Sequence, residues 1–158
     1  MNSQYTLDRI DRKILAVLQG DARISNIDLA RQVGLSPSPC HRRVRMIEKA
    51  GLIQQYVTLL DPKSVGFELI AFVEVVLGNT DRQTIAAFQQ AAVDLPEIME
   101  CHVMTGDSDY MLRIAAPNID SFRNYIMNKI LTMPGVDRTR TNISLGEVKY
   151  TTALPLIP

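Results

Sequence analysis

The sequence has no tryptophan and only two cysteines among its 158 residues. Two cysteines, Cys40 and Cys101, are too few for the disulfide framework of a small secreted domain, and they fit a reducing compartment. Long hydrophobic runs are also missing. The longest apolar run, Leu69 to Leu77, is interrupted by Glu74 and is too short to span a bilayer. The residues before position 7 are polar and do not resemble a signal peptide. We therefore expect a cytoplasmic protein that does not bind membranes.

The formal net charge is zero, but the two parts of the chain carry opposite charge. Residues 1–60 contain nine Lys and Arg against five Asp and Glu, whereas residues 61–158 contain eight against twelve. A basic surface can therefore exist on the first part even though the total is neutral, and such a local field is what nucleic acid responds to.

Three short helices are expected in the first fifty residues. Apolar residues recur at helical spacing from Leu7 to Leu18, and Gly20 then breaks the pattern. A second helix follows a capping sequence at Ser25 and ends at Gly34. The third begins almost at once, which is the spacing of a helix-turn-helix motif.

Two prolines stand at the head of this third helix. A proline loses nothing in the first turn, because the first N–H groups of a helix have no acceptor inside it. Either Ser36 caps a helix that starts at Pro37, or Ser38 caps one that starts at Pro39. Since Pro39 disfavours helical geometry at Ser38, we expect the second register or a distorted first turn.

The third helix has one basic face and one apolar face. At 100° per residue, Arg42, Arg45 and Lys49 fall with Ser38 in a narrow arc. Charged helix faces are often merely solvated. This one is nearly free of acids and lies on the helix that such motifs insert into the major groove, so we expect it to bind DNA. The residues expected at the DNA are Ser36, Ser38, Pro39, His41, Arg42, Arg43, Arg45 and Lys49.

The rest of the chain contains an internal repeat. Strand-like segments at 72–77 and 110–115 lie 38 residues apart, and so do the segments at 95–98 and 133–136. Helices are expected at 82–93 and 121–131, the second capped by Asp120. A strand, helix and strand, repeated, predicts a ferredoxin-like βαββαβ sheet, so the protein is expected to be of the α+β class.

This fold serves enzymes, RNA binders and regulatory domains alike, so local chemistry must decide. Exposed aromatic residues for base stacking are missing from the expected strands except for Tyr110. The only histidines, His41 and His102, do not lie where a base for Ser108 is expected. Each follows a cysteine, and adjacent residues diverge, so no metal site is expected. We expect no catalytic residues, no metal and no cofactor.

The sequences "LDRIDRKIL", "RISNIDLARQVGLSPSPCHRRVRMIEKAGLI" and "GDSDYML" resemble the Lrp/AsnC family of transcription factors. The similarity covers essentially the whole chain and implies dimers that assemble further, often to octamers, bind double-stranded DNA and respond to amino acids. We expect a DNA-binding domain at 1–52, a β-rich connector at 53–62 and an oligomerisation and effector domain at 63–158.

Residues 106–109, Gly-Asp-Ser-Asp, predict a turn between two strands. Such a turn can simply connect the two strands of a hairpin. It can also bind a free amino acid, because Asp107 or Asp109 can accept hydrogen bonds from an ammonium and N–H groups near Gly106 can bind a carboxylate. The family resemblance implies that this hairpin lies between dimers. With the positions that the resemblance implies around it, the expected effector residues are Thr105, Gly106, Asp107, Asp109, Tyr110, Ile119, Asn142, Ile143 and Ser144.

The effector expected first is leucine or methionine, because Ile119 and Ile143 would give an apolar wall. Ser108 and Asn142 depart from the leucine-responsive members of the family, which have aromatic residues there. The sheet face without helices is expected to pair with a second copy, through Val73, Val75, Met111 and Arg113 or their alternates Phe72, Glu74, Leu112 and Ile114.

The sequence therefore predicts a sequence-specific transcriptional regulator whose oligomeric state or DNA affinity responds to an amino acid. The alternative is a ferredoxin-like small-molecule-binding or enzymatic domain with a helical head that contacts protein.

Overall fold

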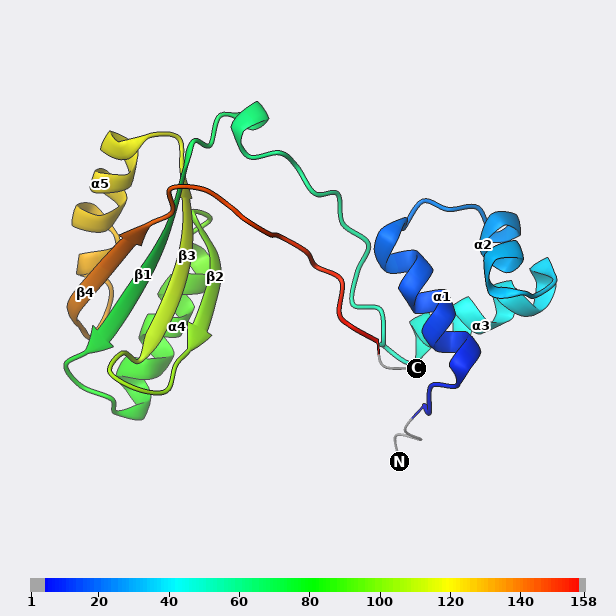
Figure 1. Ribbon diagram of the computed structural model, residues 1–158. Coiled ribbons are helices and arrows are strands. Elements are labelled where there is room, and N and C mark those ends of the chain that lie inside the picture. The colour runs from blue at the N-terminus through cyan, green and yellow to red at the C-terminus, as the bar shows by residue number, and fades with distance from the viewer. Residues whose placement is uncertain (1–4, 157–158) are drawn as a thin grey trace. The chain divides into compact units, whose positions relative to one another are not determined.

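The computed structural model describes residues 5–156, which form two compact units (Figure 1). One unit extends to Thr58 and also includes the segment from Lys149 onward, and the other is Leu59–Val148. The sequence-based division assigned residues 149–158 to the C-terminal domain. Packing instead assigns the described part of that segment to the helical unit.

The helical unit contains α1 (Arg9–Gly20), α2 (Asn26–Val33) and α3 (Pro37–Lys49). Asp8 caps α1 by accepting hydrogen bonds from two backbone N–H groups, and Ser25 caps α2 by accepting one from the N–H of Asp28. Gly34 ends α2 with φ +77°, a backbone conformation that glycine adopts without strain. The expected helix-turn-helix is present.

Helix α3 begins at Pro37 with Ser36 as its N-cap residue, so the first of the two registers is the correct one and the favoured start at Pro39 is not. Pro37 and Pro39 both lie in the first turn, where N–H groups have no intrahelical acceptor, and neither proline removes a bond. The side chain of Asn26 also donates to the carbonyl of Pro37 at 2.9 Å. This bond joins the start of α2 to the start of α3.

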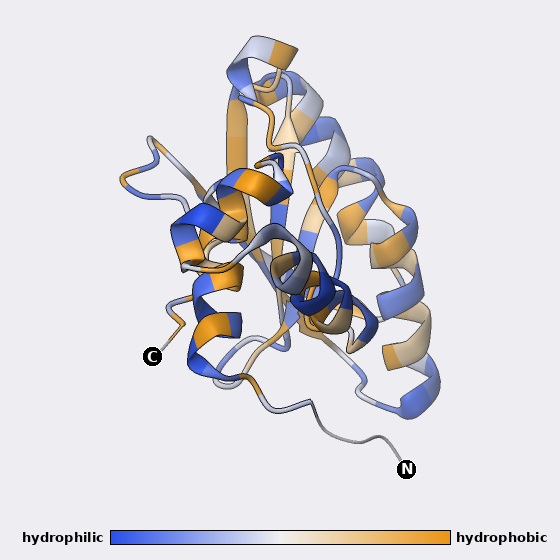
Figure 2. Ribbon diagram, turned by 90° about the vertical axis from the view of Figure 1, so that its right-hand side faces the viewer, coloured by the Kyte–Doolittle hydropathy of each residue, from blue (hydrophilic) through white to orange (hydrophobic). Residues whose placement is uncertain are grey.

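One apolar cluster holds the three helices together. Each helix has an apolar stripe that faces the other two, and Figure 2 shows orange and blue segments alternating along the helices. The buried members of the cluster are Ile14, Leu15, Leu29, Ala30, Val33, Cys40 and Ile47.

The second unit is a four-stranded antiparallel sheet of order β2-β3-β1-β4 with helices on one face. This arrangement is the expected α+β fold. Its elements are β1 (Leu69–Leu77), α4 (Arg82–Asp94), β2 (Ile98–Val103), β3 (Tyr110–Ala116), α5 (Ile119–Asn128) and β4 (Val136–Ile143), with short 3-10 helices at Lys63–Val65 and Ile130–Thr132. Asn118 caps α5, so the prediction of Asp120 as its cap was wrong.

The two faces of the sheet differ in their covering. Val73 pairs with Leu112 and both are fully buried beneath the helices, whereas Phe72 pairs with Arg113 on the other face, where Phe72 is 39% exposed. The expected grouping of Val73 with Arg113 was wrong, because it mistook the register of β1 against β3. The bare face carries Phe72, Glu74, Val76, Met111 and Arg113.

Residues 53–62, expected to be a β-rich connector, belong to no strand. Several of their apolar side chains, Val57, Leu59 and Leu60 among them, are exposed. A strand exists only with a hydrogen-bonded neighbour, and this segment has none in the described chain. No described helix has the length and apolar character needed to cross a bilayer.

Candidate functional site

The outer surface of α3 carries the predicted basic face. Cys40 and Ile47 are fully buried against the other helices, which turns the opposite side of α3 outward. Arg42, Arg45 and Lys49 are exposed, and within residues 5–156 none of the three lies within salt-bridge distance of a carboxylate. Three cations without partners on one exposed helix face are suited to bind a polyanion.

The smaller residues expected at the DNA also lie near this face. Ser36, Ser38 and His41 are exposed, while Pro39 is half-buried. The Ser36 side chain makes no capping hydrogen bond, so its hydroxyl is available to a ligand.

Arg43, also predicted to contact DNA, has its guanidinium engaged by carboxylates of the helical unit. It is 28% exposed, and its Nη1 donates to Asp8 Oδ2 at 2.6 Å and to Asp11 Oδ1 at 2.7 Å. Asp11 is buried and also accepts a hydrogen bond from the hydroxyl of Tyr5. These bonds to Asp11 and then Asp8 raise the pKa of the Arg43 guanidinium. Arg43 therefore fastens α3 to α1 and is not part of the basic face.

In the second unit, Asp109 fastens the β2–β3 turn to the end of β1. Its N–H donates to the carbonyl of Val75, its carbonyl accepts from the N–H of Met104, and its Oδ2 accepts from the N–H of Leu77 at 2.8 Å. One carboxylate oxygen of Asp109 is thus committed to the backbone.

Tyr110 points into the core. Its ring packs on Phe88 with the ring centroids 4.5 Å apart, and its hydroxyl accepts a hydrogen bond from Gln89. Tyr110 is nearly fully buried, so it supports the turn from below and does not present a surface to a ligand.

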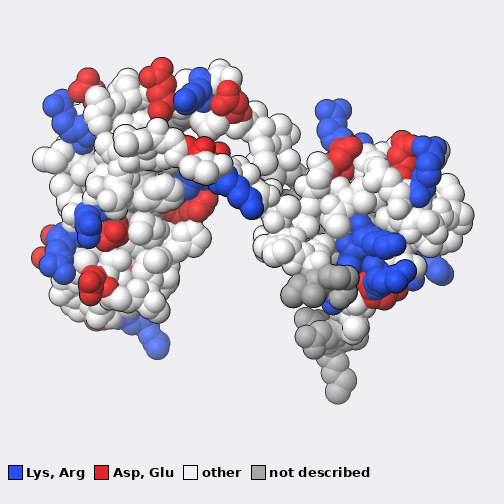
Figure 3. All heavy atoms as spheres, in the orientation of Figure 1, with Lys and Arg blue, Asp and Glu red and all other residues white. Residues whose placement is uncertain are grey.

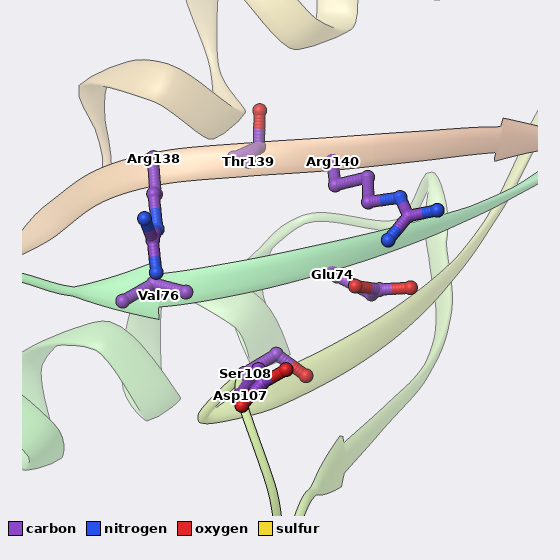
Figure 4. A pocket seen from close by; sticks show the side chains of 7 residues that line it. All are labelled: Glu74, Val76, Asp107, Ser108, Arg138, Thr139 and Arg140. Atoms are coloured by element: carbon purple, nitrogen blue, oxygen red, sulfur yellow. The ribbon is translucent and has the colours of Figure 1, made fainter.

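A polar cavity of about 280 Å³ lies beside this turn, on the bare face of the sheet (Figure 4). Strand β4 contributes two arginines, β1 a glutamate and a valine, and the turn an aspartate and a serine. The lining residues are Glu74, Val76, Asp107, Ser108, Arg138, Thr139 and Arg140. Guanidinium groups can hold a carboxylate by paired hydrogen bonds, and carboxylates can accept from an ammonium, so the cavity offers both partners that a free amino acid requires.

The arginines of this cavity were missed in the sequence. Arg138 and Arg140 are two residues apart on a strand and so point to one face. That spacing was visible in the sequence, but the pairing of Arg140 with Glu74 depends on β4 lying beside β1.

The remaining predicted effector residues lie further along the sheet. Asn142 donates to Glu74 Oε1 at 3.4 Å and so borders the cavity. Ser144 donates its N–H to the carbonyl of Ile70, near the start of β1, and Ile119 begins α5 beyond the far end of β3. The length of β3 separates Ile119 from the turn at 105–109 by about 20 Å. One chain alone therefore does not bring these residues together.

Both charges are mixed over the second unit, and neither dominates the side drawn in Figure 3. Within residues 5–156, no group of three or more His, Cys, Asp or Glu side chains could hold a metal ion.

Two family models match the chain. One, described as a winged helix-turn-helix DNA-binding domain, matches residues 7–54 and so covers α1 to α3. The other, described as the Lrp/AsnC ligand binding domain, matches residues 70–154 and so covers the sheet and its helices.

Known proteins resemble the chain over nearly its whole length. The leucine-responsive regulatory protein of Escherichia coli K12 is 44% identical over 148 residues, which are 94% of this chain and 90% of the relative. A transcriptional regulator from Neisseria meningitidis, solved in complex with L-Met, has a TM-score of 0.92 at 38% identity, covering 96% of this chain and 97% of that one. Escherichia coli AsnC has a TM-score of 0.85 at 29% identity, covering 94% and 99%. These relatives are transcriptional regulators and not enzymes, as the sequence analysis expected.

Proposed function

The chain belongs to the Lrp/AsnC family and is a DNA-binding transcriptional regulator with an amino-acid-binding domain, and on this premise we propose which residues perform each task. The outer face of α3 contacts DNA through Arg42, Arg45 and Lys49, with Ser36, Ser38 and His41 beside them. The observation that carries this proposal is that, among the described residues, these cations are exposed without a carboxylate partner, on a helix whose other face is buried. A regulator acts where the DNA is, so we propose a cytoplasmic location.

The salt dependence of DNA binding tests this assignment. We expect Arg42→Ala or Arg45→Ala to cost about 1 to 3 kcal/mol where the arginine reads a base, or to lower the salt slope by about one unit where it contacts phosphate. Arg123→Ala is the matched control, because Arg123 is an exposed arginine of the other unit. Two α3 variants that both bind like the control at every ionic strength would contradict the proposal.

The effector site is proposed to be the polar cavity together with residues of a second copy. Arg138 or Arg140 holds the carboxylate of the amino acid and Asp107 or Glu74 accepts from its ammonium, because these groups line one cavity. Val76 is the only aliphatic lining residue of the cavity. An apolar effector side chain therefore needs a wall from elsewhere, which Ile119 and Ile143 of a second copy can supply because both are exposed. Leucine and methionine stay the first candidates, and the Neisseria meningitidis relative bound to L-Met supports methionine.

The oligomer is proposed to form first through the part of the bare face around Phe72, which leaves the cavity nearer the end of β1 open to another dimer. Phe72 is an exposed aromatic residue on that face, and a second copy would cover it. A dimer also supplies two recognition helices for paired DNA half-sites. Further assembly, up to the octamer expected from the family, would bring the β2–β3 turn of one dimer near Ile119 of another. The amino acid then acts through its different affinity for the assembly states.

A further inference from the structure

The chain leaves the sheet after β4, and its described residues from Lys149 return to the helical unit. The N–H of Ser144 donates to the carbonyl of Ile70 at 2.9 Å. Beyond it, Leu145 and Val148 are fully exposed. From Lys149 onward the segment packs with the helical unit.

Gln19, near the end of α1, binds both backbone groups of Leu154. The N–H of Leu154 donates to Gln19 Oε1 at 2.6 Å, and Gln19 Nε2 donates to the carbonyl of Leu154 at 3.1 Å. One side-chain amide thus pairs with one residue as a neighbouring strand would. The Leu154 side chain takes no part, since it is 71% exposed.

Leu156 adds an apolar contact to these two bonds. Its half-buried side chain packs against the cluster that holds α1, α2 and α3 together. The segment is therefore fixed in two ways, by a directional amide pair and by burial of apolar surface.

This attachment gives the chain a second connection between its units. The first connection runs from Lys49, where α3 ends, to Leu69, where β1 begins, and can extend to about 70 Å. The second runs from Ser144 to Leu154 and can extend to only about 35 Å. While Leu154 stays bound to Gln19, the second connection therefore limits the maximum separation of the units more tightly than the first.

We propose that residues 149–156 form a C-terminal latch, an intramolecular partner of α1 that restricts the position of the DNA-binding unit relative to the effector unit. The latch begins five residues after Ser144, so a change at the end of β4 reaches α1 through a short, extended segment. Restricting the units before binding lowers the entropy cost of placing two recognition helices on DNA. Gln19 and Leu156 are then positioning residues for DNA binding, although neither belongs to the basic face of α3.

Hydrogen exchange of the full chain tests the latch directly. We expect Gln19→Ala and Leu154→Pro to speed exchange of the C-terminal peptide by about tenfold, because the first removes both bonds and the second removes the donating N–H. Leu154→Ala is the matched control, since it keeps the backbone groups and truncates only an exposed side chain. Exchange of the wild-type peptide at the rate of an unstructured chain, or equal exchange in Leu154→Pro and Leu154→Ala, would overturn the latch. Protection from exchange that disappears when the protein is diluted would show that the segment binds another copy of the chain. That result would overturn the intramolecular assignment.

DNA affinity tests the consequence. The dissociation constant for a two-half-site DNA should rise about three- to tenfold in Gln19→Ala and Leu154→Pro, and stay unchanged in Leu154→Ala, because the loss is one of preorganisation. The salt slope should stay the same in all three variants, since no DNA-contacting cation is removed. Equal affinities across the wild type and all three variants would overturn the positioning role.

Discussion

Arg43 and Asp11 form an ion pair between α3 and α1, with Nη1 of the arginine 2.7 Å from Oδ1 of the aspartate. The Asp11 side chain is 3% exposed, so its carboxylate depends for compensation on Arg43, on the hydroxyl of Tyr5 and on the backbone N–H of Asp8. Removing one partner of such a pair leaves a buried charge without compensation.

Arg43→Ala should therefore destabilise the helical unit, by about 2 to 3 kcal/mol after allowance for the partial exposure of Arg43. Arg42→Ala should change the free energy of unfolding by less than about 0.5 kcal/mol, because Arg42 is a surface residue. Urea unfolding followed by circular dichroism measures both. If instead Arg43→Ala keeps wild-type stability and loses DNA binding with a reduced salt slope, Arg43 belongs to the DNA-contacting face after all.

The contacts among Arg43, Asp11 and Asp8 also make the stability of the helical unit depend on pH. Hydrogen bonds from the backbone N–H of Asp11 and from Arg43 lower the pKa of Asp8 below its usual value of about 3.8. A lowered pKa stabilises the fold above the unfolded-state value and loses that contribution as the pH falls through the folded-state value. The urea midpoint of unfolding should therefore decrease in the wild type as the pH is lowered below about 4. The decrease should be less steep in Asp8→Asn. Identical pH profiles would mean that Asp8 does not contribute.

Replacing each of the two carboxylates of the β2–β3 turn should have a different effect on stability. Asp107→Ala should weaken amino-acid binding about tenfold or more and leave thermal stability unchanged, because Asp107 lines the cavity and makes no described hydrogen bond that holds the turn. Asp109→Ala should weaken binding as well, but at a cost of about 1 to 2 kcal/mol in stability, because the N–H of Leu77 loses its acceptor.

Calorimetry with leucine and methionine, paired with thermal unfolding, measures both effects. Wild-type affinity in Asp107→Ala would remove this residue from the effector site. Wild-type stability in Asp109→Ala would show that its bond to β1 is dispensable.

Oligomerisation through the bare sheet face can be tested at Phe72. Phe72→Asp should raise the dimer dissociation constant about 100-fold or more, because burying a carboxylate in the interface costs about 3 kcal/mol and the neighbouring Arg113 is already paired with Glu100. Leu145→Asp is the control, because Leu145 is fully exposed outside the sheet. Light scattering over a range of concentrations distinguishes them. A dimer that survives in Phe72→Asp would locate the interface elsewhere.

The helices and strands could be predicted wherever the sequence itself contains the pattern that determines them. The caps at Ser25 and Gly34 lie within short stretches of sequence, and the repeat of period 38 is visible when the sequence is compared with itself. The helix-turn-helix and the order of strands and helices could therefore be predicted. The role of Arg43 depends on contacts more than thirty residues away. The cavity likewise depends on β4 lying beside β1, and the bare face on the register of β1 against β3. Local periodicity contains none of these pairings.

The two prolines of α3 also determine how this protein can hold a phosphate. The first turn of a helix usually offers several free N–H donors, and recognition helices use them to grip the DNA backbone. Pro37 and Pro39 have no N–H, and the N–H of Cys40 already donates to the carbonyl of Ser36. The main chain at this end of α3 is therefore a poor anion ligand. Phosphate contacts at this end of α3 should therefore come from side-chain hydroxyl and guanidinium groups. The affinity for DNA should then respond to single side-chain replacements more sharply than in a helix whose first turn has all its N–H groups.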